Sequence, residues 1–210
     1  VTAPSFVGSG ANLTSLPAAN LTGSLPAISA ANLTNIPAAN LTGTLPAISG
    51  ANLTGISGGK ILQVVSTTKT DPFSSSSTSY VDVTGLSATI TPASSSNKIM
   101  VLVTACGNTN GSKGYGRIVR DSTAIAVGDA DGSKVQATFD MNNAASGNRG
   151  QSYVGSILDS PNTTSATTYK LQIRHENGAG NANINRLHVN DDSSVNGRYS
   201  STITLMEVSV

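Results

Sequence analysis

The chain has 210 residues, of which 38% are hydrophobic but only 11% are charged, and its formal net charge is +1. Average soluble proteins carry roughly 25% charged residues, so this composition is more typical of a fibrous or β-rich surface protein than of a cytosolic enzyme. The sequence has no basic stripe of the kind that binds nucleic acid. It also has no stretch of the roughly 20 apolar residues that a membrane-spanning helix needs. We therefore predict neither a nucleic-acid partner nor membrane insertion.

Charge divides the chain at Lys60. Residues 1–59 contain no Asp, Glu, Lys, Arg or His, so all 12 basic and all 11 acidic residues lie from Lys60 onward. A change of composition this sharp indicates a domain boundary. We expect an uncharged repetitive segment at 1–59 and a second domain at 60–210. The sequence begins with Val1 rather than Met, and we expect a processed or shortened form of a longer protein.

The first part contains an internal repeat of 20 residues. Residues 11–30 and 31–50 differ at only four positions, and a third copy begins at Ala51. A proline recurs every 9 or 11 residues within these copies. Because proline disfavours helix and holds the preceding residue in extended geometry, we predict extended segments that are joined by bends.

The apolar residues of the repeat cannot all be buried by one extended chain. Repeats of this kind become stable by stacking on neighbours, and a three-fold bundle buries the apolar edge of every chain equally. We therefore predict a homotrimeric stem. The residues expected to pack between its chains are Leu13, Leu16, Leu21, Leu25, Ile28, Leu33, Ile36, Leu41, Leu45, Ile48, Leu53 and Ile56.

Two other interpretations of the repeat remain open. Its Ala-Asn-Leu-Thr units resemble those of pentapeptide-repeat proteins, which form a single-chain β-helix. The units here lie 8 and 12 residues apart, however, and prolines stand between them. The segment is alternatively a disordered linker, although linkers rarely need apolar residues in register.

Strand signals dominate residues 60–210. Short runs of β-branched and apolar residues alternate with turn residues such as Asn-Gly and Asp-Gly, and this pattern predicts an antiparallel β-sandwich or jelly roll without helices. The expected strands are Ile61–Thr67, Ser79–Val83, Leu86–Thr91, Lys98–Ala105, Arg117–Arg120, Ala124–Val127, Val135–Phe139, Tyr153–Leu158, Thr168–Arg174, Ile184–Val189 and Thr202–Val208.

Two of these strands are apolar on both faces. Residues 99–103 (Ile-Met-Val-Leu-Val) show this fully and residues 203–206 (Ile-Thr-Leu-Met) more weakly, whereas residues 169–174 alternate strictly. A strand with two apolar faces lies centrally or at a subunit interface, and we expect burial between protomers. The single cysteine, Cys106, follows the first of these runs. We interpret it as a small buried hydrophobe rather than a nucleophile.

Several segments carry a resemblance to a known family. These are Lys60–Val65, Val81–Leu86 with Ile90–Pro92, Ser96–Ile99, and Thr202–Val208 at the end. Together with the preceding Ala-Asn-Leu-Thr repeats, they resemble the C-terminal domain of phage fibre proteins. The resemblance implies an all-β protein with an extended trimeric fibre stem and a jelly-roll-like head. It also implies a place on the virion surface and attachment to other virion proteins through a part upstream of this chain.

The sequence offers no catalytic motif, so we predict no enzymatic activity and no cofactor. It has two histidines and two glutamates, and no metal-protease, nucleophile-elbow or phosphate-loop pattern. Residues His175, Glu176, His188, Asp191 and Asp192 form a weak alternative metal cluster. Asp129–Gly132 resembles the start of a calcium loop but lacks its later acidic ligand. We predict no metal.

Three long polar segments, 107–115, 142–149 and 176–181, are the candidates for recognition, because loops carry binding functions more often than strands do. The residues that we expect to contact a host-surface glycan or protein are Asn108, Asn110, Lys113, Tyr115, Asn148 and Arg149. Two alternatives remain. One is a purely structural collar, capsid or neck fibre without a receptor role. The other is a polysaccharide-degrading spike, which requires paired carboxylates.

Overall fold

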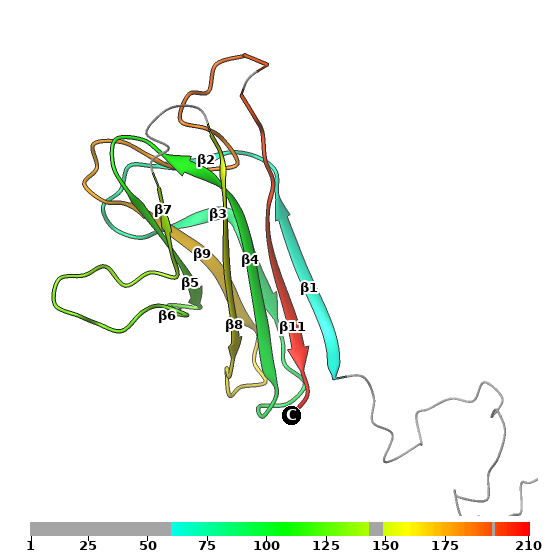
Figure 1. Cartoon of the computed structure of the whole chain (residues 1–210). Coiled ribbons are helices and arrows are strands. Elements are labelled where there is room, and N and C mark those ends of the chain that lie inside the picture. The colour runs from blue at the N-terminus through cyan, green and yellow to red at the C-terminus, as the bar shows by residue number, and fades with distance from the viewer. Residues whose placement is uncertain (1–59, 143–148, 195) are drawn as a thin grey trace, which may run out of the picture. The chain divides into compact units, whose positions relative to one another are not determined.

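The computed structural model describes residues 60–142, 149–194 and 196–210, and they form two antiparallel β-sheets (Figure 1). The all-β prediction is confirmed for these residues. The expected stem, residues 1–59 with its twelve packing residues, lies outside them. In the part of the chain that the structure describes, no helix has the length and hydrophobicity that a membrane crossing requires.

The first sheet, sheet A, has four long strands side by side. β11 lies between β1 and β4, and β8 pairs with the other edge of β4. The short strands β10 and β2 pair with each other beyond the ends of β11 and β1. The strands of this sheet are β1 (Ile61–Lys69), β2 (Phe73–Ser75), β4 (Lys98–Thr109), β8 (Gln151–Asp159), β10 (Ala182–Ile184) and β11 (Ser201–Val208).

The second sheet, sheet B, has β9 between β3 and β5, with β6 and β7 on the far edge of β5. Its strands are β3 (Val81–Ile90), β5 (Gly114–Arg120), β6 (Thr123–Ile125), β7 (Phe139–Met141) and β9 (Thr167–His175). In both sheets, strands that are distant in sequence pair with each other, and the first strand of the domain pairs with the last.

The inward side chains of the two sheets form one hydrophobic core. Along the long strands β3, β4, β9 and β11, alternate residues are buried, as the two-residue period of a strand requires. Sheet A contributes Val101 and Val103, and sheet B contributes Leu171 and Ile173, each completely buried. Aliphatic residues dominate this core, and the chain has no tryptophan.

Two carboxylates lie among these inward positions, and both are satisfied. Glu207 accepts hydrogen bonds from Gln63 Nε2, Ala93 N and Asn97 Nδ2 at 2.5–2.7 Å. Burial alone would raise its pKa, but these hydrogen bonds lower the pKa of the Glu207 carboxyl below its ordinary value. The carboxylate therefore fastens the loop that leads into β4 to the last strand.

Asp159, at the end of β8, joins the two sheets. Arg120 Nη1 lies 2.8 Å from both of its carboxylate oxygens, and Tyr169 donates its hydroxyl at 2.7 Å. Burial and the adjacent Asp159 raise the pKa of Tyr169, so the phenol stays protonated and remains a donor. A buried carboxylate with two such partners holds β8 against β5 and β9.

The observed strands correct several predictions. The expected strands Ser79–Val83 and Leu86–Thr91 form one strand, β3, because Gly85 adopts a φ of +82° and makes a bulge rather than a turn. The strand expected at Val135–Phe139 begins only at Phe139. The strand expected at Ile184–Val189 ends at Ile184.

Asn185 explains why β10 ends at Ile184. Its φ is +59°, and its side chain donates to Lys69 O at 2.8 Å and accepts from Ser201 Oγ at 2.6 Å. Asparagine tolerates this left-handed geometry better than most residues do. The side chain thereby ties the end of β1 to the start of β11, and the chain leaves the sheet at this point.

Candidate functional site

The outer face of sheet A is apolar and exposed. We call it the apolar face and define it by Leu62, Val64, Met100, Leu102, Val154, Leu158, Met206 and Val208. Val64 is 57% exposed, Val154 65% and Leu158 44%. Large apolar side chains scattered singly over a surface are ordinary, but a contiguous group indicates an interaction site.

The register of the sheet places these side chains side by side. Val64 pairs with Met206, Met206 with Met100, and Met100 with Leu158, so one apolar row crosses β1, β11, β4 and β8. In the next row of outward side chains, Leu102 lies among hydroxyl-bearing residues. The apolar row therefore lies toward the end of the sheet at which β1 begins (Figure 1).

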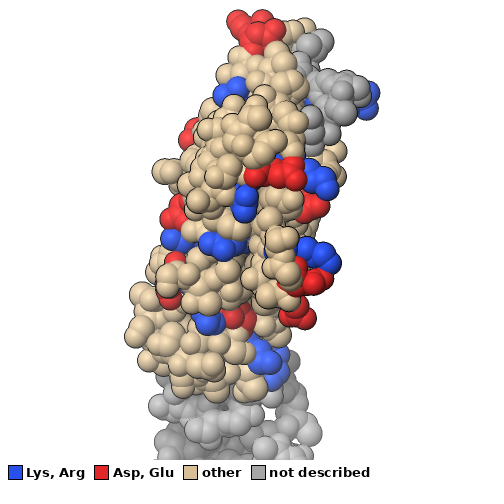
Figure 2. Space-filling model, turned by 90° about the vertical axis from the view of Figure 1, so that its left-hand side faces the viewer, with Lys and Arg blue, Asp and Glu red and all other residues tan. Residues whose placement is uncertain are grey.

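Charge is almost absent from this face. Among the outward positions of β1, β4, β8 and β11, only Lys98, at the start of β4, is charged. The outer face of sheet B differs, since it carries Asp82, Arg117, Lys170 and Arg174. Figure 2 views the molecule from the side of β5 and β6 and shows both signs of charge interspersed there. The two sheets thus present opposite chemistry to their surroundings.

This arrangement suits association of the face with another apolar surface. A second copy of the same face brings no like charges together, apart from Lys98 at its rim, and excludes water from exposed aliphatic groups. The sequence predicted outward apolar residues on β4 and β11 only. It did not reveal that Val64 and Leu158 complete the row, because this depends on the register between distant strands.

The structure changes the expected recognition residues. Asn108 was predicted in an exposed loop, but it lies within β4 and is 0% exposed. Its Oδ1 accepts from Asn183 Nδ2 at 3.3 Å, so a partner amide on β10 satisfies it inside the fold. The prediction that Asn108 lies exposed in a loop is therefore wrong, and its contact with a receptor remains a prediction.

The other expected recognition residues have different surroundings. Lys113 and Arg149 are exposed, and Tyr115 is half-buried on β5. Asn110 is partly buried, and its Oδ1 accepts from Asn181 N at 2.7 Å. Asn148 lies outside the described residues. The structure thus joins segments 107–115 and 176–181 into one surface.

Histidine holds that surface together. His175 is completely buried, its Nε2 lies 2.9 Å from Asn110 O, and its Nδ1 accepts from Gly178 N at 3.1 Å. Both ring nitrogens are therefore occupied within the protein. In the described residues, no group of three or more His, Cys, Asp or Glu side chains is placed to hold a metal ion.

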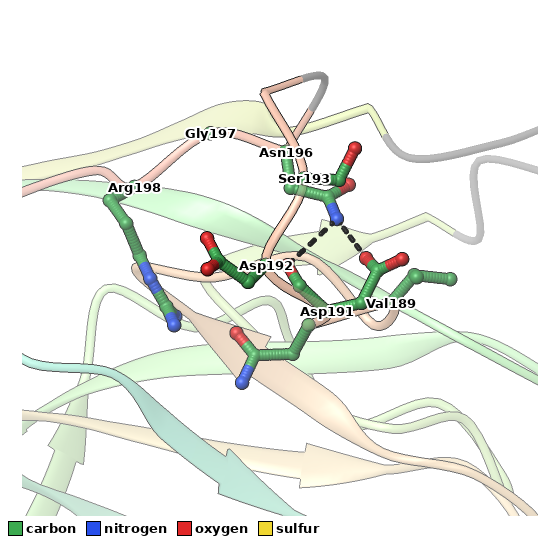
Figure 3. A pocket seen from close by; sticks show the side chains of 8 residues that line it. Val189, Asp191, Asp192, Ser193, Asn196, Gly197 and Arg198 are labelled. Carbon is green, nitrogen blue, oxygen red and sulfur yellow. Dashed lines mark hydrogen bonds between the residues drawn. The ribbon is translucent and has the colours of Figure 1, made fainter.

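A polar pocket of about 320 Å³ lies in the segment between β10 and β11 (Figure 3). Asn196 bridges it by donating from Nδ2 to the carboxylate of Asp191 and to Asp191 O. From its sequence, this region was expected to hold only a weak alternative metal cluster, although its Asn-Asp-Asp-Ser-Ser run is typical of a polar loop. The pocket is lined by Val189, Asn190, Asp191, Asp192, Ser193, Asn196, Gly197 and Arg198.

Comparison of the chain with protein-family models finds no match, and comparison with curated proteins finds none of significant similarity. The functional evidence in the molecule is therefore the contrast between its two outer faces, together with the charge-free repeat that precedes them.

Proposed function

We propose that this chain is the stem and head of a homotrimeric fibre on the surface of a virion, and that the head attaches to the host surface. The observation that carries the proposal is the apolar face, which lies beside the junction with a charge-free repeat. Three copies related by a three-fold axis bury this face and the apolar residues of the repeat together.

The fold of the head supports the proposal. In each sheet, neighbouring strands come from distant parts of the sequence. The order is β1-β11-β4-β8 in sheet A and β3-β9-β5 in sheet B. This wrapping is typical of jelly-roll sandwiches, which occur in viral surface proteins. A head of this kind presents one sheet to its partners and the other sheet and the loops to the outside.

The positions of the two ends of the head support a fibre more than a globular oligomer. The chain enters the head at Lys60, and Ser209 N donates to Lys60 O at 2.8 Å, so both ends of the head lie together (Figure 1). The connection to the repeat therefore leaves from this same end of the head. The opposite end carries the turn between β4 and β5 and the segment between β10 and β11, which are then available to a receptor.

The mass in solution of the full chain and of residues 60–210 tests this proposal. Multi-angle light scattering should find three copies in both, which would locate the assembly in the head. Three copies only when residues 1–59 are present would make the repeat the trimerisation device. A folded monomer in both cases would overturn the fibre proposal. Binding of the trimer to host cells then separates an attachment fibre from a purely structural fibre, which should not bind.

A further inference from the structure

On the outer face of sheet B, two arginines stack on one tyrosine. The guanidinium carbon of Arg117 lies 4.0 Å from the ring centre of Tyr80, and that of Arg174 lies 6.0 Å from it. Arg174 also lies 5.8 Å from the ring centre of Tyr115. Guanidinium groups at these distances are attracted to the negative face of the ring. We call these four residues the Tyr–Arg cluster.

Strand register builds the cluster from three strands. Tyr115 of β5 lies opposite Arg174 of β9, and Arg117 lies opposite Gln172. Tyr80 immediately precedes β3, whose Val81 lies opposite Ile173, so the tyrosine is next to Arg174 on the same face. All four side chains are half-buried. Packing of this kind holds the guanidinium groups in place before any ligand arrives.

The two guanidinium groups have no carboxylate partner. Every Asp and Glu of the chain is a described residue, yet none of the four ion pairs involves Arg117 or Arg174. Arg117 donates from Nε to Gln172 Oε1 at 2.8 Å. Arg174 donates to backbone carbonyls at 3.3–3.4 Å. Several N–H groups of the pair therefore remain available to an external acceptor.

The nearby acids limit which anions fit. Asp82 is the carboxylate of β3, and it accepts hydrogen bonds from Lys170 Nζ at 2.8 Å and Gln172 Nε2 at 2.7 Å. Asp140 lies opposite Tyr115 on β7 and contributes negative charge near Tyr80. A dense polyanion would meet these carboxylates. A ligand with isolated carboxylates between neutral parts can place one of them on the arginine pair alone.

We propose that the Tyr–Arg cluster binds a carboxylate-bearing saccharide, such as a chain of uronic acid residues. The planar guanidinium fork matches a carboxylate in geometry and charge. The tyrosine rings beside it supply flat apolar surface, and Tyr115 also offers its hydroxyl group, whereas the Tyr80 hydroxyl already donates to Gln136 O at 2.8 Å. This inference rests on the proposed function, because assembly through sheet A leaves sheet B exposed and host attachment requires a ligand. An acidic peptide has the same carboxylate but no apolar ring face to lie on the tyrosines.

Calorimetric titration of the full chain with tetragalacturonate tests the proposal, with the methyl-esterified tetramer and tetraglutamate as comparison probes. We expect weak binding of the acid form, with a Kd of about 1 mM or below, and no binding of the other two. Arg117→Gln and Arg174→Gln should each weaken binding by about tenfold or more, because each removes a charge-assisted donor. The matched control is Arg198→Gln, which removes an exposed arginine from the pocket in Figure 3.

The inference would be overturned by no binding of tetragalacturonate, by equal binding of the methyl ester, or by stronger binding of tetraglutamate. Loss of binding in the Arg198 variant alone would also overturn it, because the site would then lie in the pocket. Thermal melting shows whether the variants are folded. A trimer that does not bind tetragalacturonate would contradict the ligand proposal but not the fibre proposal. A monomer that binds it would contradict the fibre proposal but not the ligand proposal.

Discussion

Lysine in place of Val64 should weaken the proposed trimer without unfolding the head. Val64 is 57% exposed in the single chain, and full burial of such a side chain contributes about 2 kcal/mol. Roughly 1 kcal/mol per copy therefore remains to be gained on assembly, or about 3 kcal/mol for three copies. Val64→Lys removes this and adds charge to the apolar row. We expect the association constant of residues 60–210 to fall by about two orders of magnitude or more.

The assay is light scattering of residues 60–210 over a dilution series, with thermal melting of each variant. Thr89→Lys is the control, because Thr89 is exposed on the outer face of sheet B. Substitutions at exposed sites usually change folding stability by less than about 0.5 kcal/mol. If Val64→Lys dissociates at no higher concentration than the parent and the control, the apolar face is not the interface.

Three further substitutions test the packing of the head. Glu207→Gln should lower the free energy of unfolding by about 1–3 kcal/mol. The folded-state pKa of Glu207 is lowered from 4.5. The difference in denaturant midpoint between the parent and Glu207→Gln should therefore be largest at neutral pH and should shrink as the pH falls below 4.5. Arg120→Met should cost about 2–3 kcal/mol in chemical denaturation, because it removes the cation paired with Asp159. Gly107→Ala should cost about 3 kcal/mol or prevent folding, because a Cβ there would lie 1.8 Å from a backbone oxygen of β10.

The Gly107 and Arg120 substitutions have controls within the chain. Gly128→Ala introduces a Cβ into open space and should leave the melting temperature unchanged. Tyr169→Phe removes one hydrogen bond to Asp159 but keeps the Arg120 pair, so it should cost only about 1 kcal/mol. Equal effects of Arg120→Met and Tyr169→Phe would contradict the role given to the buried ion pair.

The longer strands were predictable from sequence because a single local pattern specifies them. Strict alternation marked residues 169–174, and an apolar run marked β4. β2, which has three residues and is rich in serine, has no such pattern, since it exists only by pairing with β10. The left-handed turn at Asn185 likewise depends on partners from β1 and β11, which no local window contains.

The surfaces were predictable only in part, for the same reason. Two-sided apolar character in β4 indicated an interface, but the full row required the register of four strands. Asn108 was misplaced because Asn-Thr-Asn-Gly has the composition of a loop, whereas its amide is paired across the sheet with Asn183. The Tyr–Arg cluster combines residues as far apart in sequence as Tyr80 and Arg174, so sequence spacing gave no signal for it.

The pairing of the first strand with the last has a mechanical consequence. A pull on Lys60 directed along β1 loads the ladder between β1 and β11, which runs from Val208 opposite Ile61 to Ser201 opposite Lys69. Such a load slides one strand lengthwise past the other, so the whole ladder bears it at once instead of opening one hydrogen bond at a time. β11 is itself anchored along β4. A pull in this direction therefore meets more resistance than a pull at right angles to β1, which would peel the terminal strand away from β11.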